Sequence, residues 1–317
     1  MNDPLVIGDM RVASGERAAQ TIDVPLGEET VTVPVIAING GQAGPRVSVT
    51  AGVHGAEYVG IEAARRLGTE IDPTRVRGSI VVVPIVNTTS FHRRAIYTSG
   101  LDGNNLNRMF PGNKDGMPSE RLAYWIFETI IRPSDYYLDL HGGDMIEALV
   151  PFAIYLASED KQVEQTSLEM AQATGIERII RGLTAGSTYA AATAAGIPAV
   201  LAEIGGQGVW SDELVEAHKE GALGVLRYLG VLPGDKPVHA GQRVYDTFAW
   251  MRAEQDGLFH PNVQIGETVR EGQPIGRITD YFGSELQSLS AVAGGEIVFL
   301  VTSLAMNAGD PLLAIGA

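Results

Sequence analysis

The pattern of hydrophobic and polar positions changes along the first third of the chain. Residues 21–24 and 30–38 alternate between apolar and polar positions, as exposed antiparallel strands do, and a turn-prone Gly-Glu-Glu sequence separates them. Residues 46–53 predict a third strand, an apolar helical pattern follows at 58–67, and residues 80–86 form a short apolar strand. Because short apolar strands flanked by helices are typical of a buried sheet, this region predicts an α/β domain.

The alternation of strands and helices continues to about residue 229. We expect helices at residues 120–131, 163–174, 187–195 and 212–229, and strands at 136–140, 152–156 and 199–203. Pro233, Gly234 and Pro237 then mark a boundary. Beyond it, turn signals separate short predicted strands at 253–258, 268–271, 275–279 and 295–300, which indicates an all-β module. We therefore divide the chain into an N-terminal β segment at 1–45, which packs on an α/β unit at 46–232, and a β module at 238–317.

The composition limits the cellular environment and the binding partners that we expect for this chain. The 38 acidic and 23 basic residues give a net charge of -15, and such a surface repels nucleic acid, whose binding depends on phosphate neutralisation. No apolar run approaches the roughly 20 residues that a membrane helix needs. The first 25 residues lack the apolar core of a signal peptide, so we expect a cytoplasmic protein without a membrane partner. The absence of cysteine leaves His, Asp and Glu as ligands for any metal.

Two short motifs at predicted strand ends carry metal-binding chemistry. The first is HGAE at residues 54–57 and the second is DLH at residues 139–141. His54, Glu57 and His141 together offer two imidazoles and one carboxylate, a set that catalytic zinc sites use when one coordination position stays open for water. A lone His-x-x-Glu pair is most often a surface ion pair. The joint occurrence of the motifs favours a metal site.

Two further carboxylates lie at predicted strand ends. Glu203, within AEIGG at residues 202–206, is a candidate general base. Asp139 could accept the second N–H of an imidazole ligand and so fix its orientation; the alternative is an ordinary strand-end acid. We expect its partner to be His54, because Asp139 and His141 point in parallel from one strand face. The remaining histidines lack such context and are predicted to be surface or packing residues: His92, His218, His239 and His260.

These motifs, together with DGNNLNRMFPG at residues 102–112, resemble the succinylglutamate desuccinylase/aspartoacylase family. Their order and spacing agree with that family from about residue 46 to the C-terminus. The resemblance implies a zinc-carboxypeptidase-like fold, in which helices cover both faces of a mixed central sheet, followed by a barrel-like β module. It also implies that His54, Glu57 and His141 bind one Zn²⁺ and that Glu203 is the general base.

The same resemblance assigns the substrate-binding residues. It implies that Asn107 and Arg108 hold a substrate carboxylate or amide, and Arg is independently suited to bidentate carboxylate binding. The alternative is a loop turn with a solvated Arg108. The family often carries a second arginine, which polarises the scissile carbonyl, about eleven residues before Arg108, where this chain has Tyr97. Arg93 and Arg94 lie just upstream, and we expect Arg94 to take over this role.

The C-terminal part resembles the hammerhead barrel of biotinyl and lipoyl carrier domains, through residues 266–276 and 293–297. A carrier needs a lysine for its prosthetic group, and no lysine occurs after Lys236, which excludes a covalent carrier role. We therefore expect the module to form a wall beside the active site or a surface for contacts within a homo-oligomer.

The combined interpretation is a zinc-dependent amidohydrolase that removes an acyl group from a small N-acyl amino acid or N-acyl amine. One alternative is a zinc carboxypeptidase acting on short peptides, although a walled cleft favours small substrates. The family also includes deacetylases of N-acetyl-diaminobutyrate. A non-catalytic, metal-dependent binding protein is the alternative from another class. It would be expected to lack a ligand or Glu203, and this chain has all four residues.

Overall fold

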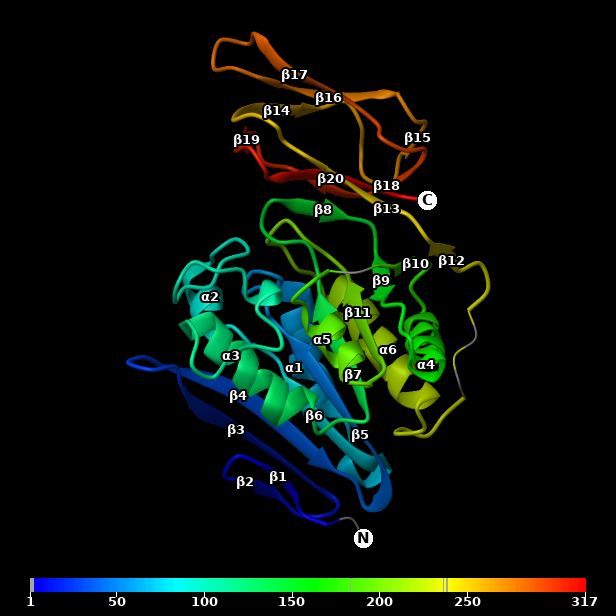
Figure 1. Cartoon of the computed structure of the whole chain (residues 1–317). Helices are drawn as coiled ribbons and strands as arrows, with labels where there is room; N and C mark the ends of the chain where they lie inside the picture. The colour runs from blue at the N-terminus through cyan, green and yellow to red at the C-terminus, as the bar shows by residue number, and fades with distance from the viewer. Residues whose placement is uncertain (1–2, 183, 236, 238) are drawn as a thin grey trace.

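The computed structural model describes residues 3–182, 184–235, 237 and 239–317, and a nine-stranded mixed sheet forms the centre of this described part (Figure 1). Its strands, in spatial order, are β12 (Arg243–Tyr245), β10 (Arg178–Arg181), β9 (Phe152–Tyr155), β11 (Ala199–Glu203), β7 (Tyr136–His141), β5 (Gln42–Ala51), β6 (Arg77–Val83), β4 (Thr30–Asn39) and β3 (Glu16–Pro25). The strands from β11 through β7 and β5 to β6 run parallel, whereas β9, β4 and β3 each pair antiparallel with a neighbour. The predicted α/β fold with a mixed sheet is confirmed.

Helices cover both faces of this sheet. On one face α1 (Tyr58–Glu70) and α4 (Lys161–Ala173) each pack against α6 (Asp212–Tyr228), and the three helices share one apolar core. On the other face α3 (Pro118–Ile126), the π-helical turn η3 (Phe127–Ile131) and α5 (Thr188–Ala194) contribute to a second core. The short helix α2 (Thr88–Arg93) contacts β4, and two 3-10 turns are η1 (Pro73–Arg75) and η2 (Leu106–Arg108). Within the described residues, no helix combines the length and apolar character needed to cross a membrane.

The apolar runs in the sequence explain why the sheet is covered twice. Successive side chains of a strand point to opposite faces. In β6, Ile80 and Val82 enter the core beneath α1, while Val81 and Val83 enter the opposite core. A continuous apolar strand therefore buries both of its faces, which requires a layer of helices on each side.

Two sequence predictions differ from the structure. The helix expected at 120–131 is an α-helix that continues into the π-helical turn η3. The strand expected at 253–258 is wrong, because residues 254–256 form an exposed turn between β13 (Phe248–Arg252) and β14 (Gly257–Pro261). The three polar residues of this turn, Glu254, Gln255 and Asp256, separate two apolar stretches that belong to different strands, and Asp256 accepts a hydrogen bond from the backbone of Ala308. Two further strands missed near the N-terminus are β1 (Leu5–Ile7) and β2 (Met10–Val12).

The C-terminal region folds into two sheets with a common core. One contains β13, β20 (Pro311–Gly316), β18 (Gly295–Val301) and β15 (Thr268–Val269), in that order. The other contains β17 (Glu285–Ser290), β16 (Pro274–Thr279), β14 and β19 (Ala305–Met306). Ile278 and Leu289 of the second sheet belong to the same apolar core as Val269 and Leu313 of the first. We call residues 246–317 the β module from here on.

Two strand pairings join the β module and the segment that leads into it to the α/β unit (Figure 1). Strand β8 (Glu147–Leu149), from the α/β unit, pairs with β18 of the module, and β12, which leads into the module, extends the central sheet beside β10. Arg178 of β10 donates two hydrogen bonds, of 2.8 and 2.6 Å, to Glu296 of β18, which also accepts one of 2.7 Å from Tyr245. The expected start of the module, at Val238, lies outside the described residues.

Candidate metal centre and the cavity around it

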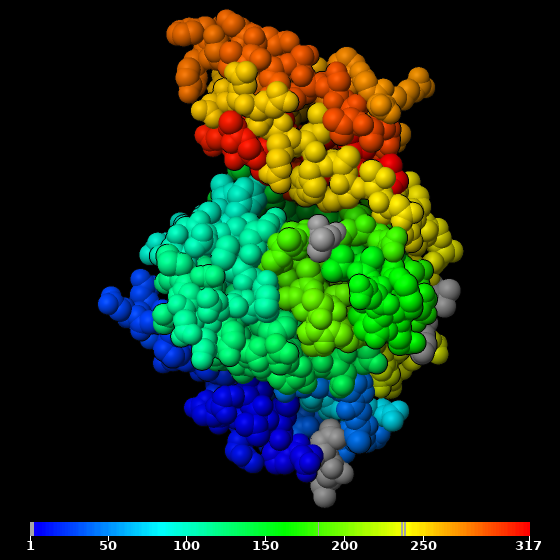
Figure 2. All heavy atoms as spheres, in the orientation of Figure 1, coloured from blue at the N-terminus to red at the C-terminus, as the bar shows by residue number. Residues whose placement is uncertain are grey.

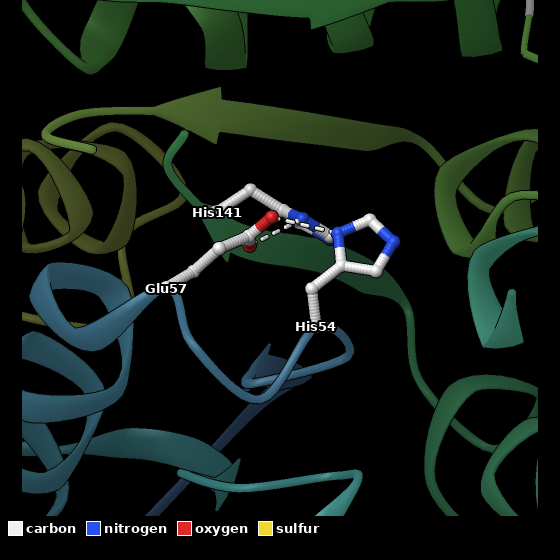
Figure 3. Close-up of side chains that lie close together, drawn as sticks. All are labelled: His54, Glu57 and His141. Atoms are coloured by element: carbon white, nitrogen blue, oxygen red, sulfur yellow. Dashed lines mark hydrogen bonds and ion pairs between the residues drawn. The ribbon is translucent and has the colours of Figure 1, made fainter. Parts of the chain in front are cut away.

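Three predicted ligands meet at the carboxyl ends of β5 and β7 (Figure 3). One ligand-type atom from each of His54, Glu57 and His141 lies within 4.8 Å of the others, and all three residues are buried. Glu57 lies between the two imidazoles, with Oε1 2.6 Å from His54 Nδ1 and Oε2 2.8 Å from His141 Nδ1. Burial opposes the charge on Glu57, but the two imidazoles outweigh it and lower the pKa of Glu57 to about 2.

Local sequence explains how the first two ligands reach this position. β5 ends at Ala51, and Gly52 turns the chain with a φ of 64°, a conformation that residues with a side chain rarely adopt. Gly55 follows, and a Cβ atom there would lie 2.1 Å from the backbone nitrogen of Phe91, so only glycine allows this close approach. Glu57 then takes the N-cap position of α1. The tight strand-to-helix turn thus brings both side chains of the HGAE motif to the end of the sheet.

The second nitrogen of each imidazole has its own partner. His141 Nε2 donates to Asp139 Oδ2 at 3.0 Å, and His54 Nε2 donates to Asn105 Oδ1 at 3.1 Å. The prediction that Asp139 accepts a hydrogen bond from the His54 imidazole is therefore wrong. Two residues apart on one strand face, Asp139 and His141 lie side by side, and the imidazole is long enough to reach back to the carboxylate.

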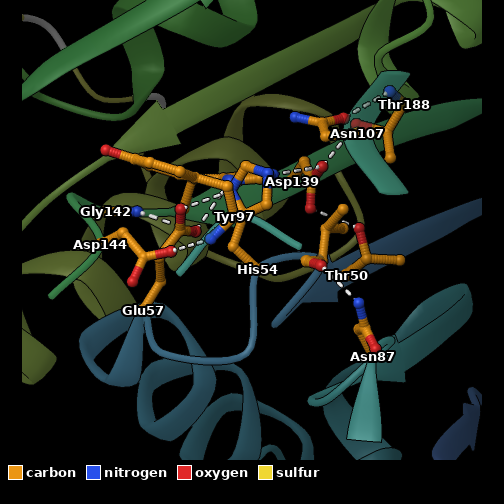
Figure 4. Close-up of polar contacts among 12 residues, drawn as sticks. Thr50, His54, Glu57, Asn87, Tyr97, Asn107, Asp139, Gly142, Asp144 and Thr188 are labelled. Carbon is orange, nitrogen blue, oxygen red and sulfur yellow. Dashed lines mark hydrogen bonds and ion pairs between the residues drawn. The ribbon is translucent and has the colours of Figure 1, made fainter. Parts of the chain in front are cut away.

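Asp139 is itself held by hydroxyl groups (Figure 4). Thr50 donates to its Oδ1 atom at 2.6 Å, Thr188 donates to its Oδ2 atom, and the carboxylate is fully buried. These bonds keep the carboxylate turned toward His141 Nε2–H, which leaves the Nδ1 lone pair of His141 directed at Glu57. A carboxylate behind a histidine ligand in this way fixes its tautomer and raises its basicity.

The residues present fit a divalent metal with an open coordination position. Two imidazole nitrogens and one carboxylate converge, and each imidazole donates its other N–H to an oxygen acceptor. Three such ligands plus a water molecule are the arrangement of catalytic zinc sites. Without a metal, burial opposes charging of His54 and His141, yet the adjacent carboxylates raise the pKa of both. The cluster therefore attracts positive charge.

Glu203 lies beside this cluster. It is the last residue of β11 and pairs in register with His141 on β7 and with Phe152 on β9. Its Oε2 atom is buried and has no hydrogen-bond partner among the described residues. Burial raises the pKa of Glu203 well above the ordinary value, because an unpaired carboxylate is poorly stabilised away from water. The structure therefore places a carboxyl group that readily takes up a proton next to the candidate metal site.

A cavity of about 770 Å³ opens from the cluster toward the β module. His54, Glu57, His141 and Glu203 line one side of it, and residues of the module line the other. Figure 2 shows the module seated above the α/β unit, at the level of this cavity. The module residues in the lining are Asp246, Phe248, Trp250, Arg252, Phe299 and Pro311. The β module is thus a wall of this cavity, one of its two expected positions.

The predicted substrate-binding residues Asn107 and Arg108 also line the cavity. Both belong to the 3-10 turn η2, and Asn107 Oδ1 accepts a hydrogen bond of 3.1 Å from the backbone nitrogen of Thr188. Arg108 donates to the backbone oxygen of Asn107 at 2.7 Å. Burial lowers the pKa of Arg108, and the positive charge of Arg252 in the module lowers it further.

Arg94 lies elsewhere. It ends α2 with a left-handed φ of 51°, is exposed, and lines a separate pocket of about 450 Å³ with Tyr58 and Trp210. It does not line the metal-side cavity, whereas Tyr97, which stands where the family often has an arginine, does. The Tyr97 hydroxyl is buried and makes no hydrogen bond of normal geometry within the described residues. Burial raises its pKa, so it remains a proton donor.

The structure adds residues that sequence reasoning missed. Asn105 and Thr188 orient the ligand system, and only Asn105 carried a signal, because it lies in the motif at 102–112. Glu147 lines the cavity from β8, and burial raises its pKa to about 7. His218, predicted to be a surface or packing residue, is buried behind His141. Its Nε2 atom donates a hydrogen bond of 2.9 Å to the backbone oxygen of His141, and burial lowers the pKa of His218 to about 4.

Comparisons with known proteins identify relatives of this chain. The sequence profile of the succinylglutamate desuccinylase/aspartoacylase catalytic domain matches residues 43–229. The N-alpha-acetyl-L-2,4-diaminobutyric acid deacetylase of Halomonas elongata is 30% identical over 296 residues, which cover 90% of this chain and 85% of that protein. A crystal structure of a succinylglutamate desuccinylase/aspartoacylase from Rhodobacter sphaeroides is 27% identical, with a TM-score of 0.84 over 95% of each chain. The product-bound ectoine utilization protein EutE (DoeB) from Ruegeria pomeroyi is 25% identical, with a TM-score of 0.88 over 99% of this chain and 98% of that one.

Proposed function

The chain belongs to the succinylglutamate desuccinylase/aspartoacylase family, and we propose that it is a metal-dependent amidohydrolase that deacylates a small N-acyl amino acid. One observation carries this proposal: the buried His54, Glu57 and His141 cluster shares its cavity with an unpaired, buried carboxyl group, that of Glu203. Ligands for an activating metal and a group able to move protons are the two requirements for metal-assisted amide hydrolysis.

His54, Glu57 and His141 would hold one Zn²⁺, with Asp139 and Asn105 orienting the imidazoles. When bound, the metal would polarise the amide carbonyl and lower the pKa of a water molecule toward about 7. Glu203 then accepts the proton of the attacking water as the new C–O bond forms. It passes that proton to the leaving nitrogen as the C–N bond breaks, and the second proton of the water is taken up by the amine when the new acid ionises, so that a carboxylate and an ammonium product are released.

Arg108 and Asn107 would bind the carboxylate of the amino acid half of the substrate. Because Asn107 Oδ1 already accepts from Thr188, its contact to substrate would come from the Nδ2 group. Tyr97 replaces Arg94 in our account of carbonyl polarisation, because Tyr97 lines the cavity and its buried hydroxyl makes no hydrogen bond of normal geometry within the described residues. A preorganised donor of this kind typically stabilises a developing oxyanion by about 3–4 kcal/mol.

The wall that the β module forms distinguishes this function from that of a peptide carboxypeptidase. The β module covers the side of the cavity opposite the metal cluster, which leaves about 770 Å³ for the substrate. We propose that the chain is organised as an N-terminal β segment at 1–45, a zinc hydrolase domain at 46–232 and a C-terminal part at 238–317, which contains the β module. In this division the last part excludes long peptides from the metal centre.

The test is hydrolysis of a panel of N-acyl amino acids and N-acyl diamines by the zinc-loaded protein, with release of free amine as the signal. N-acetyl-L-2,4-diaminobutyrate belongs in the panel because of the similarity to the Halomonas elongata deacetylase. We expect at least one substrate to be cleaved by the wild type and not measurably by a Glu203→Gln variant that retains its metal. Equal release by both proteins would exclude Glu203 as the base.

A further inference from the structure

One strand of the β module presents a distinctive surface to the cavity. Phe248, Trp250 and Arg252 are alternate residues of β13, and all three line the cavity. Alternate residues of a strand share a face, so β13 turns two aromatic rings and one cation toward the substrate space. The Trp250 residue is 43% exposed, a large accessible fraction for an indole that nothing in the proposed reaction uses.

Phe248 and Trp250 are the accessible part of a packed aromatic cluster, because Phe152 and Phe299 are buried. Ring centroids lie 5.8 Å apart for Phe152 and Phe248, 5.2 Å for Phe248 and Trp250, and 4.9 Å for Trp250 and Phe299. The last two pairs pack edge to face, so the rings fill the space between them. A cage for an ammonium group needs open space between the ring faces. The surface is therefore suited to an apolar or aromatic group of the ligand.

Cations border this surface. Within the described residues, no carboxylate lies at ion-pair distance from Arg108 or Arg252, and each uses its guanidinium for a backbone oxygen instead. The two charges are close enough for Arg252 to lower the pKa of Arg108. Because both arginines line one cavity and neither has an acidic partner within the described residues, both are available to an anion of the ligand. On the module side, the described lining offers one acid, Asp246, as a partner for an ammonium group of a ligand.

We propose that the preferred substrate is an N-acyl amino acid that carries an aromatic or similarly bulky apolar group, in its acyl half or in its side chain. This inference rests on the proposed deacylase function. The apolar group packs on Phe248 and Trp250, and the carboxylate lies between Arg108 and Arg252. A diaminobutyrate derivative would leave the aromatic surface uncovered and would place its ammonium group near two arginines.

The experiment compares kcat/KM for four substrates of the zinc-loaded enzyme. N-acetyl-L-alanine is the reference, N-acetyl-L-phenylalanine carries the ring in the amino acid, N-phenylacetyl-L-alanine carries it in the acyl group, and N-acetyl-L-2,4-diaminobutyrate carries an ammonium group. We expect one of the two ring-bearing substrates to exceed the reference about 10-fold or more, the range that apolar contacts give in a substrate pocket. Which of them does so identifies the half of the substrate that faces the module.

Substitution of Trp250 tests the surface itself. In Trp250→Ala, the ratio of kcat/KM for the preferred ring-bearing substrate to that for N-acetyl-L-alanine should fall about 10-fold, and Trp250→Phe should restore part of it. The matched control is Phe282→Ala, which removes a 94% exposed ring from another strand connection of the same module and should leave the ratio unchanged. Thermal unfolding of each variant shows whether the module remains folded.

Arg252 tests the anion. Arg252→Gln should raise KM about 10-fold for the ring-bearing carboxylate and much less for its carboxamide analogue, because only the carboxylate loses a charged partner.

Hydrolysis of N-acetyl-L-alanine or N-acetyl-L-2,4-diaminobutyrate with no gain from a ring in either half would overturn the inference and leave the proposed function intact. An unchanged substrate ratio in Trp250→Ala would overturn it as well. If the zinc-loaded enzyme releases amine from none of the four substrates, both the proposed function and the inference fail.

Discussion

The two walls of the cavity differ in how far their polar groups are buried and bonded to one another. On the metal side, the imidazoles of His54 and His141 and the carboxylates of Glu57 and Asp139 are buried and joined to one another by short polar contacts. On the module side, Trp250 and Arg252 are exposed to the cavity, and Arg252 has no acidic partner among the described residues. Groups that must hold a fixed geometry are over-determined by neighbours, whereas groups left uncovered are available to a ligand. In our proposal, the reaction therefore belongs to the α/β unit and substrate choice to both walls.

The largest effect should come from the proton acceptor on the metal side. Glu203→Gln keeps the shape of the side chain but removes its ability to accept a proton, so kcat should drop by about 10²–10⁴-fold. KM and metal content should stay close to wild-type values, because neither wall loses a binding group. Steady-state kinetics together with elemental analysis measure both. Near-normal kcat would show that the base lies elsewhere.

A smaller effect on the same wall should follow from Asp139→Asn. Thr50 and Thr188 both donate to this carboxylate, so an amide would have to turn its NH₂ group toward a donor. We expect zinc affinity to fall about 10–100-fold, as for other groups that orient a ligand histidine. Competition with a chromogenic chelator measures this affinity. Thr188→Ser, which retains the hydroxyl, is the conservative control, and equal affinity in Asp139→Asn and the wild type would remove Asp139 from the metal system.

On the substrate side, Arg108→Lys should change binding more than turnover. Lys keeps the positive charge but cannot form two parallel bonds to a carboxylate. KM for an anionic N-acyl amino acid should therefore rise severalfold, and much less for its carboxamide analogue, with kcat nearly unchanged. A matched loss on both substrates would contradict the assignment of Arg108 to the carboxylate.

The smallest effect should come from Arg94→Ala. The Arg94 side chain is exposed and lines another pocket, so kcat and KM should both remain within about twofold of wild type, as for most surface substitutions. Tyr97→Phe, which removes the buried hydroxyl of a residue that lines the cavity, should instead lower kcat on every substrate. A large loss of kcat in Arg94→Ala would restore the role predicted from the sequence.

The contrast between the walls also explains how far the sequence could be interpreted. The ligand cluster was predictable because His54 and Glu57 lie three residues apart in one turn, and because His141 ends a recognisable strand. Strand ends of a parallel sheet meet at one edge, so local motifs were enough to bring them together. The partner of Asp139 was not predictable in this way, since it depends on how far an imidazole reaches along its own strand.

Local sequence patterns could not predict residues that reach the cavity through pairing of strands far apart in the sequence. Glu147 enters the cavity because β8 pairs with β18, about 150 positions later in the sequence, and no motif marks this strand. The sequence pattern predicts a strand that includes residues 254–256, whereas these polar residues form a turn. Trp250 and Arg252 carried no signal either, because their importance comes from where the β module sits and not from their neighbours in sequence.

The central claim is that His54, Glu57 and His141 hold one catalytic metal ion. Elemental analysis of the purified wild-type protein and of His141→Ala, after equal exposure to zinc and removal of the excess, tests it most directly. A site with three protein ligands loses most of its zinc affinity when one of them is removed. We therefore predict close to one zinc per wild-type chain and little in the variant. Equal zinc content in both proteins, or none in the folded wild type, would contradict the account.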